Sequence, residues 1–281
     1  MLNVIRQSAP LLIVAATMTL VITTSGIDLS VGSVVALVGA LAALALRAGV
    51  PELVVIPGGI ILGGLIGAIN GYFVAFAGMP AFIVTLGTLS VVRGIALLTT
   101  RGYSIPVNGN GFFTSLGRGH LLGLPAPAVI AIVSLIAAWI ALRHTRFGRY
   151  VVGIGTNAEG IRRAGVNVRR VTMQVYMLSG ASAGLAGMIE TARLGSGSSN
   201  QGSGFELAVI AAVVLGSTNL FGGRGTILGT LLGALTIAVL GNGLILINVS
   251  PFYTQIIQGT IMILAIWLNT RIFTPQRQTK N

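Results

Sequence analysis

Residues 59–70, GIILGGLIGAIN, place glycine at every fourth position among large aliphatic side chains. They lie inside an apolar run over residues 53–76 that contains no charged residue. Such a run is long enough to cross a hydrocarbon core of about 30 Å as a helix. Small residues four positions apart share one face of a helix and let a neighbouring helix approach closely in lipid. The stretch therefore predicts a closely packed transmembrane helix.

The composition of the whole chain agrees with that prediction. Only 8% of its 281 residues are charged and 54% are hydrophobic, whereas about 25% of the residues in a soluble domain are charged. Residues 129–142 are almost continuously apolar, unlike the alternating strands of a transmembrane barrel. We therefore predict an all-α, polytopic membrane protein with a single transmembrane domain over residues 1–281. The nine expected spans cover about residues 8–25, 30–46, 53–76, 80–98, 121–142, 171–190, 205–220, 226–247 and 253–272.

The residue types that carry most enzyme chemistry are scarce. The chain contains no Cys and two His, which excludes disulfides and argues against the usual His or Cys metal sites. A phosphate-binding P-loop needs a Lys after its last Gly, and Lys280 is the only Lys. We expect no catalytic residue, metal or cofactor, so ATP, if used, must bind another chain. The basic residues lie in loops between apolar runs, which argues against a nucleic-acid partner.

A second copy of the opening stretch occurs 166 residues later. Residues 225–236, GTILGTLLGALT, match the first copy at seven of twelve positions. Upstream of each copy stands an acidic residue followed by Leu, a small residue and Val, beginning at Asp28 and Glu206. The shared order predicts two repeat halves, about residues 1–98 and 121–272, which the alternation of spans makes inverted.

When the spans of the two halves are paired, one span has no counterpart. The spans at 253, 226, 205 and 171 pair with those at 80, 53, 30 and 8, and the span at 121–142 has no counterpart. We therefore expect that the first helix of a ten-helix arrangement, preceding residue 1, is missing.

The loop over residues 143–170 is the strongest marker of orientation. It contains seven arginines, and positively charged loops remain on the cytoplasmic side of a membrane. Alternation from this loop places eleven basic residues inside and five outside. It predicts a cytoplasmic tail over residues 273–281 and a periplasmic segment over residues 99–120. Arg93 lies within a span near its outer end, and we expect its side chain to extend to the membrane surface.

The same loop contains a signal for a short helix. Residues 156–159, TNAE, have the form of a capping box, and a glycine six residues later stands where a left-handed residue would end the helix. A solvated connector is the alternative, but a connector could be much shorter than 28 residues. We therefore expect this segment to dock against another protein. The residues expected to carry the docking are Thr156, Asn157, Glu159, Arg162, Arg163 and Gly165.

A few polar residues stand in or beside the predicted spans. A carboxylate at a span's end, such as Asp28 or Glu206, costs several kcal/mol unless it is solvated, paired or capping a helix. Asp28 precedes Ser30 at the start of the next span and fits an N-cap equally well. Asn70 and Asn219 fit hydrogen bonds between helices as well as contact with a solute. We assign these five residues either to the translocation pathway or to pinning of the two halves.

Three motifs resemble one family over essentially the whole chain. GIDLSVGS at residues 26–33, FGR at 147–149 with Asn157, and LFGGRG at 220–225 resemble the membrane permeases of ribose-type monosaccharide ABC importers. The resemblance implies a bacterial inner-membrane subunit that forms a homo- or heterodimer in the lipid. It also implies a cytoplasmic ATPase that binds ATP and magnesium, a periplasmic solute-binding protein, and a coupling helix over residues 153–165.

The chain departs from this family in two respects, and other interpretations of its function stay open. Members of that family usually have an additional N-terminal stretch and helix, and an acidic residue where this chain has Ala208. Permeases for branched-chain amino acids share weaker versions of the motifs and are the nearest rival. A secondary transporter driven by an ion gradient would place titratable carboxylates near the bilayer midplane, whereas Asp28, Glu190 and Glu206 are predicted near span ends. A membrane scaffold that transports nothing is the third interpretation.

Overall fold

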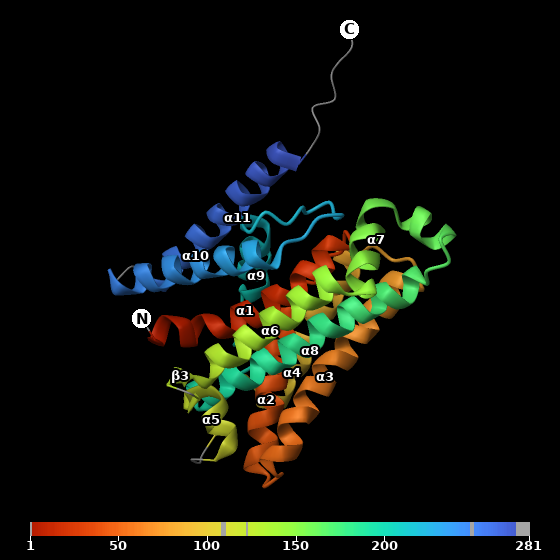
Figure 1. Ribbon diagram of the computed structural model, residues 1–281. Helices are drawn as coiled ribbons and strands as arrows, with labels where there is room; N and C mark the ends of the chain where they lie inside the picture. The colour runs from red at the N-terminus through yellow and green to blue at the C-terminus, as the bar shows by residue number, and fades with distance from the viewer. Residues whose placement is uncertain (1, 108–110, 122, 248–249, 274–281) are drawn as a thin grey trace.

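The computed structural model describes residues 2–107, 111–121, 123–247 and 250–273. Long helices make up most of it, and the short strands form two separate antiparallel pairs, β1 with β4 and β2 with β3 (Figure 1). The helices are α1 (Leu2–Thr23), α2 (Val31–Arg47), α3 (Glu52–Ala75), α4 (Ala81–Thr100), α5 (Phe112–Arg118), α6 (Ala126–His144), α7 (Arg146–Arg163), α8 (Val168–Leu194), α9 (Phe205–Leu215), α10 (Ile227–Leu246) and α11 (Pro251–Phe273). The strands are β1 (Ile105–Pro106), β2 (His120–Leu121), β3 (Leu124–Pro125) and β4 (Ser196–Gly197).

The predicted spans correspond in order to α1–α4, α6 and α8–α11. Among the described residues, five helices are long and apolar enough to cross a membrane: α1, α3, α4, α6 and α10. α2, α9 and part of α11 are shorter apolar helices, and α8 has 27 residues. The prediction of an all-α, polytopic membrane protein is confirmed. Apart from Phe273, the predicted tail lies outside the described residues.

Two predicted spans extend well beyond the helices that the structure shows. The span expected over residues 205–220 is α9, which ends at Leu215 after 11 residues, because Gly216 and Ser217 turn the chain. A helix of this length is about 16 Å long and cannot cross the membrane core alone. The span expected over residues 121–142 begins only at Ala126, because the chain before it forms the β2–β3 hairpin.

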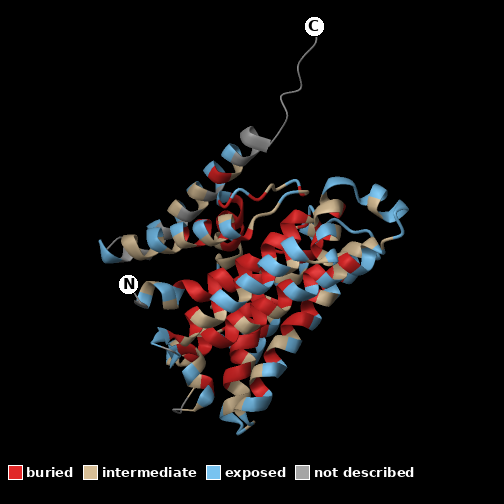
Figure 2. Ribbon diagram, viewed as in Figure 1, coloured by how far each residue is buried: buried red, intermediate tan, exposed pale blue. Residues whose placement is uncertain are grey.

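α1 and α2 form the centre of the described structure. α1 packs against α6, α8, α9 and α10, and α2 packs against α3, α4 and α8. Twelve residues of α2 between Val31 and Ala43 are buried, as expected for a helix that is apolar on all sides. Figure 2 shows the buried residues as a continuous interior, while exposed positions lie on the outer helices.

The glycines of the opening stretch bring α3 against α8 along their length. A Cβ atom at Gly63 or Gly67 would collide with the backbone of Gly180 or Tyr176 on α8. In the same way, Gly184 of α8 lies directly against the backbone of α3. The prediction that these glycines serve close helix packing is confirmed.

The second copy of the glycine motif packs against a different partner. Gly229 and Gly233 of α10 lie against the backbones of Gly216 and Ala212, at the end of α9. In the proposed pairing of the halves, α10 corresponds to α3. The packing partner of α10 is α9, which corresponds to α2, whereas the packing partner of α3 is α8. Both copies therefore serve helix packing, and the division into two halves stays a prediction.

The segment between α8 and α9, residues 195–204, runs back along α2. A Cβ atom at Gly197 would collide with Gly39, and one at Gly202 would collide with Gly32. Between Gly39 and Gly32, α2 advances by about 10 Å. α9 therefore begins beside the first turn of α2, and the two helix N-termini lie close together.

Candidate functional site

α7 consists of two helical parts that meet at Asn157, whose φ of −157° and ψ of 88° are not helical. Oδ1 of Asn157 accepts a hydrogen bond from the backbone N–H of Gly160 at 2.9 Å and so caps the second part. The prediction that Thr156 is the capping residue is therefore wrong by one position. Thr156 belongs to the first part, where its hydroxyl donates to the carbonyl of Val152 at 2.9 Å.

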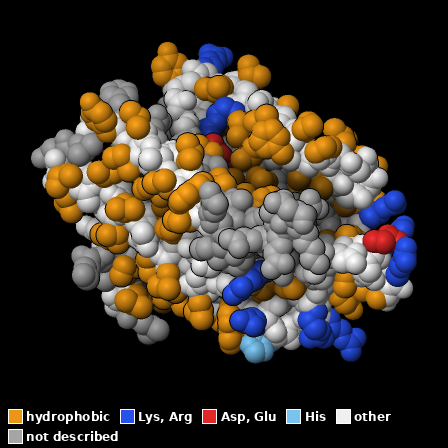
Figure 3. Space-filling model, turned by 90° about the horizontal axis from the view of Figure 1, so that it is seen from above, with side chains coloured by type: hydrophobic (Ala, Val, Ile, Leu, Met, Phe, Trp, Pro, Cys, Tyr) orange, Lys and Arg blue, Asp and Glu red, His pale blue; other side chains and the backbone are white. Residues whose placement is uncertain are grey.

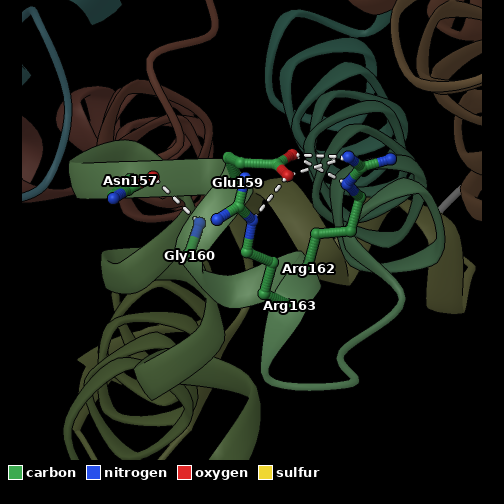
Figure 4. Close-up of polar contacts among 5 residues, drawn as sticks. All are labelled: Asn157, Glu159, Gly160, Arg162 and Arg163. Atoms are coloured by element: carbon green, nitrogen blue, oxygen red, sulfur yellow. Dashed lines mark hydrogen bonds and ion pairs between the residues drawn. The ribbon is translucent and has the colours of Figure 1, made fainter.

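Glu159 lies in the first turn after this cap and binds two arginines (Figure 4). Its two carboxylate oxygens accept hydrogen bonds from Nε and Nη2 of Arg162 at 2.8 and 2.9 Å, and from Nε of Arg163 at 3.0 Å. These bonds, those from Arg162 above all, hold the pKa of the Glu159 carboxyl below its usual value. The side chains of Arg162 and Arg163 are 71% and 79% exposed. The cluster therefore presents positive charge on the surface.

Gly165 ends this helix in the predicted left-handed conformation, with φ of 83°. Its N–H donates to the carbonyl of Arg162 at 3.0 Å, as in a glycine C-terminal cap. Two residues later, Oδ1 of Asn167 accepts from the N–H of Arg170 at 3.0 Å and starts α8. Basic side chains gather around an acidic one at one edge of the molecule in Figure 3.

The first part of α7 rests on two turns of the chain. Gly155 lies so close to the carbonyl of Thr23 and the N–H of Gly223 that a Cβ atom there would collide with both. The N–H of Gly223 donates to the Thr23 carbonyl at 2.9 Å, and the Ser25 hydroxyl donates to the Phe221 carbonyl at 2.8 Å. The turn that follows α1 and the turn that follows α9 therefore meet under α7.

Asn219 shapes the second of these turns. Its Nδ2 donates to the carbonyl of Gly222 at 3.0 Å, and its Oδ1 accepts from the N–H of Phe221 at 3.1 Å. The structure thus places Asn219 beside α7, apart from the other polar residues singled out in the sequence.

Three of those residues, Asp28, Ser30 and Asn70, meet in one buried hydrogen-bond network. Oδ1 of Asp28 accepts from the N–H and hydroxyl of Ser30 at 3.0 and 2.6 Å, and Oδ2 accepts from the Ser179 hydroxyl at 2.8 Å. Nδ2 of Asn70 donates to Oγ of Ser30 at 2.9 Å, and Thr88 donates to Oδ1 of Asn70 at 2.6 Å. The network ties the start of α2 to α3, α4 and α8. The N-cap position is occupied by Ser30 rather than Asp28.

Glu206 is only partly buried, and it lies within the first turn of α9 rather than before the helix. A Cβ atom at Gly32 would collide with Oε2 of Glu206 and with the carbonyl of Gly202. Oε2 has no hydrogen-bond partner among the described residues. The carboxylate therefore sits against the first turn of α2, where the helix dipole favours negative charge.

Arg93 is a site residue that sequence reasoning missed. Its Nη1 donates to the carbonyls of Ser199 and Gln201, at 2.5 and 2.7 Å, and Glu206 lies close enough to attract its charge. The expectation that Arg93 extends to the membrane surface is therefore wrong. A charged residue within an apolar span was the available signal, but its partners are 106 and 108 positions away.

Comparison with known proteins places the chain in a family. Residues 1–266 match the family described as the permease component of the branched-chain amino acid transport system. The chain belongs to this family. It is a multi-pass inner-membrane permease, and the resemblance found in the three sequence motifs is confirmed.

Several curated permeases are similar to this one. Ribose import permease protein RbsC of Escherichia coli (strain K12) is 44% identical over 275 residues, 96% of this chain and 85% of that protein. RbsC of Bacillus subtilis (strain 168) is 42% identical over 271 residues, 96% and 84% of the two chains. The D-allose transport system permease protein AlsC of E. coli K12 is 37% identical over 250 residues, 88% and 76% of the two chains. No solved structure matches the chain.

Proposed function

We propose that this permease is the membrane subunit of an ATP-driven importer for a monosaccharide, ribose or a sugar of similar size. The observation that carries the proposal is the identity of 41–44% to ribose permeases over nearly the whole chain. Similarity to an allose and a galactofuranose permease supports monosaccharides as the substrate class.

The complete importer contains other chains. Two permease subunits, identical or different, form the pathway in the lipid, and a periplasmic binding protein delivers the sugar. A cytoplasmic ATPase binds ATP and magnesium and carries out the hydrolysis, so this chain does no covalent chemistry. The seven arginines of residues 143–170 support a cytoplasmic position for α7 and for the C-terminus.

The contacts of α7 support a route from the ATPase to the pathway. α7 docks on the ATPase through its second part, while its first part rests on the turns that follow α1 and α9. Movement of α7 on ATP binding shifts both turns, one of which leads into α2 and the other out of α9. The pathway between the subunits thereby changes the side to which it opens.

Uptake of labelled ribose into proteoliposomes tests the proposed function. We expect uptake only when ATP, the ATPase and the binding protein are all supplied. Uptake driven by an ion gradient without the ATPase would contradict the proposal and favour a secondary transporter. Labelled leucine is the second solute, because the family description names branched-chain amino acids. Import of leucine and not of ribose would contradict the assignment to sugars.

Charge reversal in α7 tests the docking surface. We expect Arg162→Glu with Arg163→Glu to abolish co-purification of the ATPase, because both exposed guanidinium groups are replaced. Membrane insertion should not change. Arg47→Glu, on the exposed end of α2 and predicted on the opposite side of the membrane, is the matched control. An unchanged yield of the complex from the double variant would contradict docking through α7.

The chain lacks Cys, so introduced cysteines report orientation cleanly. A cysteine replacing the exposed Ala164 should react with an impermeant thiol reagent only from the cytoplasmic side. Reaction from the periplasmic side would overturn the orientation.

A further inference from the structure

Arg93 and Glu206 are a pair of opposite charges that attract each other inside the part of the chain that crosses the membrane. Arg93 lies on α4, which is long and apolar enough to span, and it precedes the end of that helix by seven residues, about 10 Å. Glu206 starts α9, whose other end leads to the turn beneath α7. Because α9 is about 16 Å long, Glu206 lies roughly halfway across a core of about 30 Å. The expectation that Glu206 lies at the end of a full span, away from the bilayer midplane, is therefore wrong.

Neither side chain of the pair is fully buried by its own chain. A charged side chain exposed to lipid at this depth costs at least about 2.5 kcal/mol. Such residues therefore face a water-filled cavity or the interior of an assembly rather than lipid. The face that carries this pair thus belongs to an aqueous path or to the contact with another subunit.

The neighbours of the pair favour the aqueous path. Ser90, one helical turn before Arg93, is exposed, and Asn200 and Ser203 are exposed on the segment that Arg93 holds. Added Cβ atoms at Gly87 and Gly94, on the same helix, would meet open space. Small and polar residues thus lie beside the two charged groups, together with the exposed aliphatic side chains of Val91, Ile95 and Leu207.

We propose that Arg93, Glu206 and residues 199–204 form the part of the pathway that contacts the transported solute. The pair carries no net charge, so the site suits a neutral solute rather than an anion or a cation. Carboxylate oxygens accept hydrogen bonds and guanidinium groups donate them in a fixed geometry, which matches the alternating needs of sugar hydroxyl groups. The solute class is therefore a neutral polyhydroxylated molecule, and this inference rests on the proposed function.

The two charged residues have different tasks in this site. Arg93 positions the segment over residues 199–204, because its Nη1 binds two carbonyls of that segment. Glu206 contacts the solute through the part of the residue that the chain leaves exposed, while its Oε2 is buried and has no hydrogen-bond partner among the described residues. Removing the Glu206 charge should therefore change solute binding more than it changes the backbone around it.

Cysteine accessibility tests whether the face is aqueous. Ser90→Cys is treated with a hydrophilic thiol reagent in the purified permease–ATPase complex in lipid, and its modification rate is measured. The matched control is Val133→Cys, an exposed apolar position in the middle of α6. We expect Ser90→Cys to react at least about ten times faster than the control, because the nucleophile that attacks the reagent is the thiolate, which forms in water and not in lipid. Equal rates would overturn the proposal.

Protection by solute tests the contact. We expect ribose to slow the modification of Ser90→Cys and leucine to leave it unchanged. In the background of Glu206→Gln, the rate without solute should stay the same, while the half-protecting ribose concentration rises about tenfold, equivalent to about 1.4 kcal/mol. An unchanged half-protecting concentration would overturn contact through Glu206.

Ribose uptake into proteoliposomes by the unmodified permease distinguishes failure of this site from failure of the proposed function. Ribose uptake together with an unprotected Ser90→Cys would contradict this site and leave the proposed function standing. Absence of any monosaccharide uptake would contradict the proposed function, and this site with it.

Discussion

Asp28 and Glu206 occupy matching places in the two copies of one sequence pattern, yet their surroundings differ. Asp28 is completely buried, and hydrogen bonds from Ser30 and Ser179 reach both of its carboxylate oxygens. Glu206 is partly exposed, and its Oε2 has no partner among the described residues. The surroundings of Asp28 therefore fit a structural pin, and the partial exposure of Glu206 fits the solute contact proposed above.

The contrast favours one answer to the choice that the sequence left open between pathway and pin. A carboxylate whose bonds are all made inside the chain has little capacity for a ligand, and removing it leaves its donors unsatisfied. Glu206 is partly exposed and has an oxygen without a hydrogen-bond partner among the described residues, so its carboxylate retains capacity for a ligand. Variants at the two positions should accordingly separate stability from transport.

Asp28→Ala should have the largest effect on folding. The change leaves the Ser30 N–H and two hydroxyl groups without their acceptor in the protein interior, and we expect a loss of about 3 kcal/mol in the free energy of unfolding. Unfolding in mixed micelles with increasing denaturing detergent measures it. Asp28→Asn retains one carbonyl oxygen for Ser30 and should lose less than half as much. Equal losses in the two variants would contradict the assigned bonds.

Gly32→Ala should be the next most harmful change, because Gly32 is where the two regions touch. Its Cβ atom would collide with Glu206 and with the backbone of Gly202, so we expect a loss of about 2 kcal/mol. Gly58→Ala is the matched control, since a Cβ atom there meets open space and alanine favours the helix by up to about 1 kcal/mol. The same unfolding titration compares them. Equal stability of the two variants would show that α9 does not begin against α2.

Glu206→Gln should hardly change stability. The amide has nearly the shape of the carboxylate, and no described hydrogen bond to Oε2 is lost, so the expected change is within about 0.5 kcal/mol. Thermal unfolding of the purified variant checks it. A loss close to that of Asp28→Ala would mean that Glu206 is a second structural pin.

Glu159 extends the comparison to a fully exposed carboxylate and should show the smallest effect. Arg162 and Arg163 depress its pKa, so the stabilisation of the helix end is present at neutral pH and above the usual value of 4.5. It is lost as the pH falls through the lowered pKa of the folded state. The protection factors of residues 158–165 against hydrogen exchange should therefore fall more on acidification in the wild-type protein than in Glu159→Gln. The same pH dependence of protection in the wild-type protein and in Glu159→Gln would contradict the ion cluster around Glu159.

The periodic and local features of this structure could be predicted from the sequence. Apolar runs located most of the long helices to within a few residues, because length and hydropathy decide what crosses a membrane. The spacing of glycines predicted that α3 packs closely against a neighbouring helix, and Gly165 ended α7 where a left-handed residue was expected. Each of these features depends on residues within a few turns of one another.

Features that depend on distant residues could not be predicted. α9 was expected to span, because apolar composition continues past Leu215, whereas its end is set by the turn at Gly216 and Ser217. The return of residues 195–204 along α2 depends on glycine contacts across more than 150 positions. The position of Arg93 was missed for the same reason. The carbonyls that bind its guanidinium group belong to residues 199–201, and the sequence does not show that this segment lies beside α4.

The most direct test measures ATP-driven ribose uptake per amount of folded protein for Glu206→Gln and Asp28→Asn in parallel. If one carboxylate contacts the solute and the other pins the fold, Glu206→Gln keeps the wild-type unfolding midpoint and loses most of its uptake. Asp28→Asn then has a lower midpoint, while its folded fraction transports ribose at close to the wild-type rate. Normal uptake by Glu206→Gln, or no uptake by folded Asp28→Asn, would contradict this division of roles.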